Sequence, residues 1–296
     1  MTHVATLISA PTTPAVDTAL AEAARARLAG TAIDTLANGI AADVHFRAEP
    51  GTEKAVAEDL RQALAAPVDV VVQKIGARAK GLLIADMDST MIGQECIDEL
   101  AAELGLKEKI AAITERAMRG EIAFEPALRE RVGLLAGLPA SVVAKVIAER
   151  IRITPGAIEL VRTMRANGAY TALVSGGFTV FTGPSSKMIG FHEHRSNLLI
   201  EADGKLAGTV AEPILGQDAK KASLLELAAE KKVPMDLTLA VGDGANDLAM
   251  IEASGLGVAY HAKPKVAAAA HARIDHGDLT ALLYIQGYRH GEFVAG

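Results

Sequence analysis

The chain has 296 residues and a mass of 30.7 kDa, enough for a sizeable core and more than one domain, which excludes a peptide hormone and a small disulfide-stapled scaffold. Its 30 Lys and Arg residues face 36 Asp and Glu residues, and a net charge of −6 argues against nucleic acid as a partner. Half of the residues are hydrophobic but only 3% are aromatic, which suits aliphatic helices packed on a buried sheet.

Two features of the sequence bear on its compartment. Cys96 is the only cysteine and cannot form an internal disulfide, which favours a reducing, cytoplasmic setting. No basic residue precedes Arg25, and Pro11 and Pro14 interrupt the first apolar segment, so we expect no export signal. Glycines and a proline break the longest uncharged run, residues 166–186, so we expect no membrane partner.

The first 75 residues alternate between strand-like and helix-like patterns. We predict strands at 3–9, 31–36, 42–47 and 67–74, and helices at 15–28 and 52–65. The order strand, helix, strand, strand, helix, strand is the ferredoxin-like pattern, and no catalytic-looking cluster appears in it. We therefore predict a separate domain over residues 1–75, with a linker at 76–81, and a second domain over 76–296.

From Leu82 onward the pattern is that of buried parallel strands, each followed by a polar or glycine-rich turn. The predicted strands cover 82–85, 170–174, 237–241 and 256–260. Ligands of open parallel sheets bind beyond the carboxyl ends of the strands, so we expect the turns to converge on one crevice of a Rossmann-like α/β domain. Residues 94–150 carry only helical patterns and predict a helical cap, at about 93–152, that shields this crevice from water.

Acidic residues follow two of the predicted strands. Asp86 and Asp88 could serve as nucleophile and general acid/base if the turn aims both at one ligand, although such a pair alone is more often a capping or surface feature. A second acidic turn, 242–247, strengthens the chemical interpretation. Gly242 and Gly244 begin a dinucleotide-binding pattern, but Asp247 stands in place of the third glycine and would repel a pyrophosphate. Acidic turns instead favour Mg²⁺.

Five segments, in this order, resemble the haloacid dehalogenase superfamily, and within it most closely the phosphoserine phosphatases, over residues 82 to about 285. They are Asp86-Met87-Asp88-Ser89-Thr90, Glu95, Phe124-Glu125-x-x-Leu128-Arg129-x-Arg131-Val132, Val174-Ser175-Gly176-Gly177-Phe178 and Val241-Gly242-Asp243-Gly244-Ala245-Asn246-Asp247. The resemblance implies hydrolysis of a phosphate ester, O-phosphoserine, through an aspartyl-phosphate in the last step of serine biosynthesis.

The resemblance also implies roles for particular residues. Asp86 is the expected nucleophile and Asp88 the proton donor, and Mg²⁺ is expected on Asp86, Asp243 and the main-chain carbonyl of Asp88. Lys220 is the expected family lysine, although Lys221 beside it faces another direction and competes for the assignment. The expected phosphate ligands are Ser175, the Gly176 amide and Asn246, and Asp247 is expected to orient Lys220 or a metal-bound water.

Substrate choice is expected to depend on the cap. Glu95 and Arg131 fall where the resemblance places the contacts with the ammonium and carboxylate groups of phosphoserine, and Met118 and Phe124 would form apolar walls. Taken alone, Glu95 is better explained as a helix cap and Arg131 as a surface residue; their joint match favours the binding role.

The sequence leaves two alternative functions open, and it also allows a homodimer. The same chemistry could transfer the phosphoryl group to another hydroxyl, such as that of homoserine. The order of elements in residues 1–75 resembles the amino-acid-binding ACT domain, so an amino-acid-sensing protein is the alternative from another class, although Ser9-Ala10-Pro11-Thr12 lacks the glycine often used there for ligand contact. A regulatory or dimerising role for this region, and hence a homodimer, also stays open.

Overall fold

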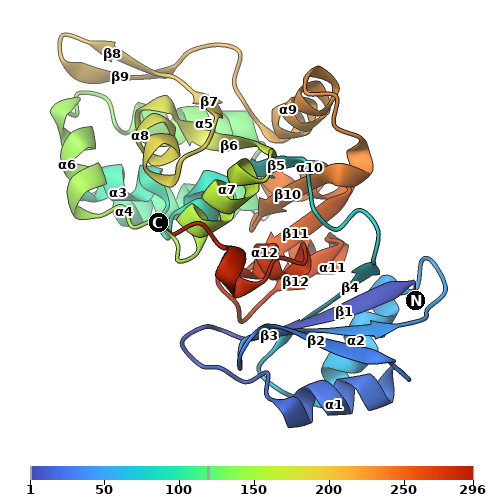
Figure 1. Cartoon of the computed structure of the whole chain (residues 1–296). Coiled ribbons are helices and arrows are strands. Elements are labelled where there is room, and N and C mark those ends of the chain that lie inside the picture. Colours follow the sequence, from blue (N-terminus) through green and yellow to red (C-terminus); the bar gives the residue numbers. More distant parts are fainter. Residues whose placement is uncertain (1, 119–120, 296) are drawn as a thin grey trace.

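The computed structural model describes residues 2–118 and 121–295, and Figure 1 shows how their elements are arranged. One four-stranded sheet, one six-stranded sheet and one hairpin account for its strands, and helices cover both large sheets. The described part of the chain has no helix long and apolar enough to cross a membrane. The α/β class predicted from the sequence is confirmed.

The four-stranded sheet is antiparallel and carries two helices on one face. Its elements are β1 (His3–Ile8), α1 (Thr18–Arg27), β2 (Ala32–Ala37), β3 (Ala41–Phe46), α2 (Glu53–Leu64) and β4 (Asp69–Lys74). Because side chains alternate along a strand, Ala5 and Leu7 of β1 point to the helices and pack with Ala24 and Leu60. The spatial order β2-β3-β1-β4 confirms the predicted ferredoxin-like arrangement.

The six-stranded sheet has the order β12-β11-β10-β5-β6-β7, and its neighbouring strands all run parallel. The strands are β5 (Leu82–Ala85), β6 (Tyr170–Phe178), β7 (Glu193–Asn197), β10 (Thr238–Gly242), β11 (Leu256–Tyr260) and β12 (Ala272–Ile274). The register sets Ala85, at the end of the central strand β5, beside Val241 of β10 and Leu173 of β6. The turns after β5 and β10 and the last residues of β6 therefore meet at one edge of the sheet; residues 175–177, predicted as a turn, belong to β6.

Helices cover both faces of this sheet. Successive side chains of β5 point to opposite faces and all are apolar, so both faces need helices to bury them. Leu82 and Ile84 pack with Leu224 of α9 (Gln217–Glu230), whereas Leu83 packs with Leu160 of α7 (Ala157–Ala166) in the larger core. The helices outside the cap are α7 (Ala157–Ala166), α8 (Thr179–Ile189), α9 (Gln217–Glu230), α10 (Leu248–Ala253), α11 (Pro264–Ala269) and α12 (Ala281–Ile285), with single turns at Met235–Leu237, Ala245–Asp247 and His290–Glu292.

Four helices occupy the stretch between β5 and α7 that the sequence assigned to a cap (Figure 1). They are α3 (Cys96–Ala102), α4 (Lys107–Met118), α5 (Phe124–Gly133) and α6 (Ser141–Glu149). The chain enters and leaves this stretch side by side: the N–H of Gly93 donates to the carbonyl of Arg152 at 3.0 Å, and that of Thr154 to the carbonyl of Met91 at 3.1 Å. These hydrogen bonds mark the hinge of the helical insertion.

A hairpin that the sequence pattern did not predict packs against the same insertion. It consists of β8 (Leu199–Ala202) and β9 (Lys205–Val210), at the upper left of Figure 1. The N–H of Gly137 donates to the carbonyl of Leu206 at 2.9 Å, and the N–H of Leu206 donates to the carbonyl of Leu138 at 2.8 Å. The connection between α5 and α6 is thereby tied to a segment that follows β7.

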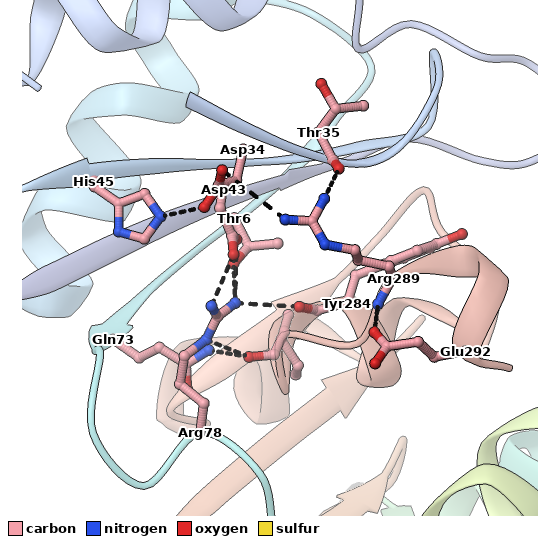
Figure 2. A network of polar contacts seen from close by, with 11 residues as sticks. Thr6, Asp34, Thr35, Asp43, His45, Gln73, Arg78, Tyr284, Arg289 and Glu292 are labelled. Carbon is pink, nitrogen blue, oxygen red and sulfur yellow. Dashed lines mark hydrogen bonds and ion pairs between the residues drawn. The ribbon is translucent and has the colours of Figure 1, made fainter. Parts of the chain in front are cut away.

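The second face of the four-stranded sheet lies against the C-terminal part of the chain, as Figure 2 shows in detail. Arg78, from the segment predicted as a linker, donates to the Asp43 carboxylate at 2.7 Å and to the main-chain carbonyls of Tyr284 and Ile285 at 3.2 Å. Thr6 donates to the same carboxylate at 2.6 Å, and Asp43 is only 2% exposed. Buried polar contacts therefore join the N-terminal sheet to α12.

Candidate active site

A cavity of about 550 Å³ lies at the edge of the six-stranded sheet where the strand-end turns meet the cap. Among the residues selected from the sequence, it is lined by Asp86, Asp88, Glu95, Phe124, Arg131, Ser175, Gly176, Asp243 and Asn246. Lys220 and Asp247 lie directly behind this lining, in contact with one another. Met118 ends α4, and its side chain lies outside the described part of the structure. The fold thus gathers the described candidates in one place.

The turn after β5, Met87–Met91, directs two carboxylates into the cavity. Asp86 accepts the N–H of Met87 at 2.8 Å, Asp88 keeps an extended backbone, and Ser89 takes a left-handed conformation with φ +54°. A non-glycine residue in that region is uncommon, and such strain persists where the surrounding structure enforces it. The tight turn explains how Asp86 and Asp88 line one cavity although a single residue separates them.

Lys220, and not Lys221, reaches the acidic groups. Its Nζ lies 2.7 Å from Oδ1 of Asp86 and 2.7 Å from Oδ1 of Asp247, and its side chain is 1% exposed, whereas Lys221 is exposed to solvent. Burial alone would lower the pKa of Lys220, but the carboxylates of Asp247 and Asp86 outweigh burial and raise it. Lys220 is therefore a permanently charged ammonium group beside Asp86.

The carboxylates of Asp86, Asp243 and Asp247 form an acidic cluster whose oxygen atoms lie within 4.8 Å of one another. Burial, and then the neighbouring Asp86, raise the pKa of Asp243 to about 7. Asp247 already accepts from Lys220 at 2.7 Å and from the N–H of Gly244 at 3.1 Å. Asp86 and Asp243 thus provide closely spaced carboxylate oxygens, the donor set that fits a hard divalent cation.

Asp88 occupies a different environment from Asp86. Within the described residues it forms no ion pair with a cationic side chain, and the N–H of Cys96 lies 3.4 Å from its Oδ1. Burial, followed by the negative charge of Glu95, raises the pKa of Asp88 well above its ordinary range. Of two carboxyl groups in one cavity, one is paired with a cation and the other favours its protonated form, which is the arrangement that nucleophile and acid require.

Small polar groups near the ends of β6 and β10 line the same cavity as Asp86. The Ser175 side chain is 1% exposed and accepts the N–H of Gly177 at 2.9 Å, and Asn246 donates to Asp86 at 3.4 Å. The carbonyl of Gly176 is held at 2.8 Å by Asn197, a buried residue of β7 that the sequence analysis missed. No motif marks Asn197, because its partners come from separate segments.

Glu95 and Arg131 bring opposite charges into the cavity without forming an ion pair in the described structure. Glu95 accepts from the Ser89 hydroxyl at 2.6 Å, and Arg131 donates to the Thr114 hydroxyl at 3.1 Å. Burial raises the pKa of Glu95 and lowers that of Arg131. Ser89, although part of the first motif, was assigned no role from the sequence, and Thr114 was missed. Each holds a charged group through a neutral hydroxyl, so both charges remain available to a ligand. Phe124 contributes an apolar wall.

A parallel sheet with a helical cap, and an acid-lined cavity at the strand ends, define a hydrolase of the haloacid dehalogenase type. The model of the haloacid dehalogenase-like hydrolase family matches residues 83–252, and the chain belongs to this family. The resemblance noted in the sequence is thereby confirmed.

Within the family, the chain is similar to phosphoserine phosphatases. It is 44% identical over 245 residues to the phosphoserine phosphatase of Streptomyces coelicolor, a match that covers 80% of this chain and 60%, less than two thirds, of that relative. A solved hydrolase of the same family from Salmonella enterica superposes with a TM-score of 0.85 and 30% identity, over 96% of this chain and 98% of the other. A phospho-aspartyl intermediate analogue of phosphoserine phosphatase superposes with a TM-score of 0.66 and 39% identity, over 70% and 98%.

Proposed function

We propose that the chain hydrolyses O-phospho-L-serine to L-serine and inorganic phosphate, with Mg²⁺ as cofactor. The observation that carries this proposal is the presence of two opposite charges, Glu95 and Arg131, in the same cavity as Asp86; within the described residues neither forms an ion pair. An amino acid phosphate carries an ammonium, a carboxylate and a phosphate group. Its site therefore needs an acidic side chain for the ammonium, a basic side chain for the carboxylate and a reaction centre for the phosphate, each at a different position. The similarity to phosphoserine phosphatases supports the same substrate.

The reaction begins at Asp86, whose carboxylate oxygen attacks phosphorus while the bond from phosphorus to the serine oxygen breaks. Asp88 gives its proton to the departing serine oxygen and leaves an aspartyl-phosphate on Asp86. Asp88 then takes a proton from water, whose oxygen attacks the same phosphorus, and the bond to Asp86 breaks to release phosphate. The raised pKa of Asp88 supports the first of its two roles. The intermediate analogue of the related enzyme supports the covalent step.

Charge neutralisation comes from Lys220 and from the cofactor. Lys220 stays close to the attacking carboxylate of Asp86, and Asp247 holds it there. Asp86, Asp243 and the main-chain carbonyl of Asp88 would hold Mg²⁺, which when bound offsets negative charge on the transferring phosphoryl group.

The remaining groups orient the substrate. Ser175, the Gly176 amide and Asn246 bind phosphate oxygens, whereas Glu95 takes the ammonium group and Arg131 the carboxylate. Phe124 closes the apolar side, whereas Met118 stays a prediction from the sequence because its side chain lies outside the described residues. These assignments follow the lining of the cavity, where phosphate ligands come from the sheet edge and amino acid ligands from the cap or its hinge.

The experiment that tests this function measures release of inorganic phosphate from O-phospho-L-serine. We expect turnover in Mg²⁺, loss of turnover after treatment with EDTA, and recovery when Mg²⁺ is restored, because the cavity otherwise confronts a phosphate dianion with several carboxylates. Homoserine in a parallel assay distinguishes hydrolysis from transfer. Phosphohomoserine formed in place of inorganic phosphate would establish the phosphotransferase alternative, and absence of both products would refute the proposal.

A second prediction addresses substrate recognition. Glu95→Gln keeps the shape of the side chain but removes the charge that faces the ammonium group, so we expect kcat/KM for phosphoserine to fall by about 10- to 100-fold. With p-nitrophenyl phosphate, which has no ammonium group, the change should stay within about threefold. Glu99→Gln is the matched control, because Glu99 lies in α3, the helix that Glu95 directly precedes, but pairs with Lys107 and Arg150. Equal losses with both substrates would contradict the assigned contact.

The proposed division into residues 1–75 and 76–296 gives the N-terminal unit a supporting role. Its second face is occupied by the contacts of Arg78 and Asp43 with α12, which favours a structural part of the enzyme over a free amino-acid-sensing module. A homodimer remains part of the proposal and is tested by the mass of the chain in solution. The buried free thiol of Cys96 supports a cytoplasmic setting.

A further inference from the structure

Two lysines stand at the mouth of the cavity and have no role in the chemistry described above. Lys263 directly precedes α11 and Lys265 lies in its first turn; both line the cavity, and both are exposed to solvent. The N–H of Lys263 donates to the carbonyl of Asp243 at 3.3 Å, which ties this segment to the acidic turn after β10. Within the described residues, the Lys265 ammonium forms no hydrogen bond or ion pair.

The interior of the cavity is unfavourable for an anionic substrate. Among the described residues, five carboxyl groups, those of Asp86, Asp88, Glu95, Asp243 and Asp247, gather around it, against two buried cations, Lys220 and Arg131. A divalent cation and a protonated Asp88 bring this balance only to about neutral. Phosphoserine enters with a phosphate dianion, so the interior alone offers little long-range attraction.

We propose that Lys263 and Lys265 form a basic rim that draws the phosphate dianion to the cavity mouth and raises kcat/KM. This inference rests on the proposed hydrolysis of a phosphate monoester. Charges at the opening of a low-dielectric cleft raise the local concentration of an oppositely charged substrate and its association rate by about 10- to 1000-fold in favourable cases. The rim acts on phosphate and not on the serine moiety, because it adjoins the Asp243 turn, whereas Glu95 and Arg131 belong to the cap and its hinge.

The test compares two double variants of the full chain that change its net charge equally. Lys263→Gln with Lys265→Gln removes the rim. Lys74→Gln with Lys187→Gln removes two exposed lysines, of β4 and α8, that do not line the cavity. Kinetics are measured with phosphoserine and with p-nitrophenyl phosphate, each at low and high ionic strength.

We expect the rim variant to lower kcat/KM for both substrates by about three- to tenfold at low ionic strength, with kcat unchanged within about twofold. The difference from the wild type should shrink as salt rises, because screening shortens the reach of charges to about 8 Å at 0.15 M and about 3 Å at 1 M. The control variant should match the wild type throughout.

Three outcomes would overturn the inference: an unchanged kcat/KM in the rim variant at low salt, an equal loss in the control variant, or a loss confined to kcat. Failure of the proposed function looks different. Suppose that the wild type turned over p-nitrophenyl phosphate but not phosphoserine, and that the rim variant still had a lower kcat/KM in a salt-dependent way. This result would support the basic rim and contradict phosphoserine as the substrate.

Discussion

Asp86→Asn is expected to lower phosphate release from phosphoserine by at least about 10⁴-fold, because an amide is a poor nucleophile and no aspartyl-phosphate can form on it. The substitution keeps the size of the side chain, so the turn after β5 should remain intact. The rate is measured with saturating phosphoserine and Mg²⁺, and circular dichroism reports whether the fold is preserved.

Asp218→Asn is the control for this substitution, because Asp218 is exposed in the first turn of α9, two residues from Lys220, and does not line the cavity. It should retain the wild-type rate within about twofold. If Asp86→Asn kept more than about one hundredth of the activity, the nucleophile would have to be another group.

Lys220→Met should combine a large kinetic loss with a loss of stability. The substitution leaves the buried carboxylates of Asp86 and Asp247 without their shared cation, and breaking such a buried pair costs about 3 to 5 kcal/mol of unfolding free energy. We expect kcat to fall by about 10³-fold, since an uncompensated charge also opposes the approach of a phosphate dianion. Steady-state rates and urea denaturation measure the two effects.

Lys221→Met provides a matched control from the adjacent position. Lys221 is exposed and faces away from Asp86, so both the rate and the stability should stay close to those of the wild type. Equal losses in the two variants, or a normal kcat in Lys220→Met, would contradict the assignment of Lys220.

The sequence predicted the parts of the fold that carry strong periodic patterns. Continuous apolar runs such as Leu82–Ala85 identify buried parallel strands, and the order of elements identifies the ferredoxin-like sheet. The β8–β9 hairpin was missed because much of it is exposed and its pattern is interrupted by Asp203 and Gly204 at the turn. The three-residue strand β12 was too short to leave a pattern.

Part of the candidate site could also be predicted, because the topology of a parallel sheet brings the ends of its strands together. Asp86 and Asp243 follow β5 and β10, and Ser175 lies in the last part of β6. The carboxyl ends of these strands must meet in a parallel sheet, so the proximity of the three residues follows from the topology. The choice of Lys220 over Lys221 needed the orientation of α9. The roles of Ser89, Thr114 and Asn197 could not be found from spacing, because each depends on hydrogen bonds to residues in another element or turn.

The contacts of the N-terminal sheet with α12 also could not be predicted from the sequence. Asp43 falls within a predicted strand and Arg78 within a predicted linker, and nothing in either segment indicates that they pair across 35 positions. Only the packed structure shows that a strand carboxylate is buried and compensated there.

The most direct test of the account is to trap the covalent intermediate. The enzyme is mixed with ³²P-labelled phosphoserine and Mg²⁺, quenched in acid within the first turnover, and digested so that the labelled peptide can be identified by mass spectrometry. We predict an acid-stable, base-labile label on Asp86 that is absent from Asp86→Asn. A label on another residue, or rapid turnover with no labelled peptide at any time, would contradict phosphoryl transfer through Asp86.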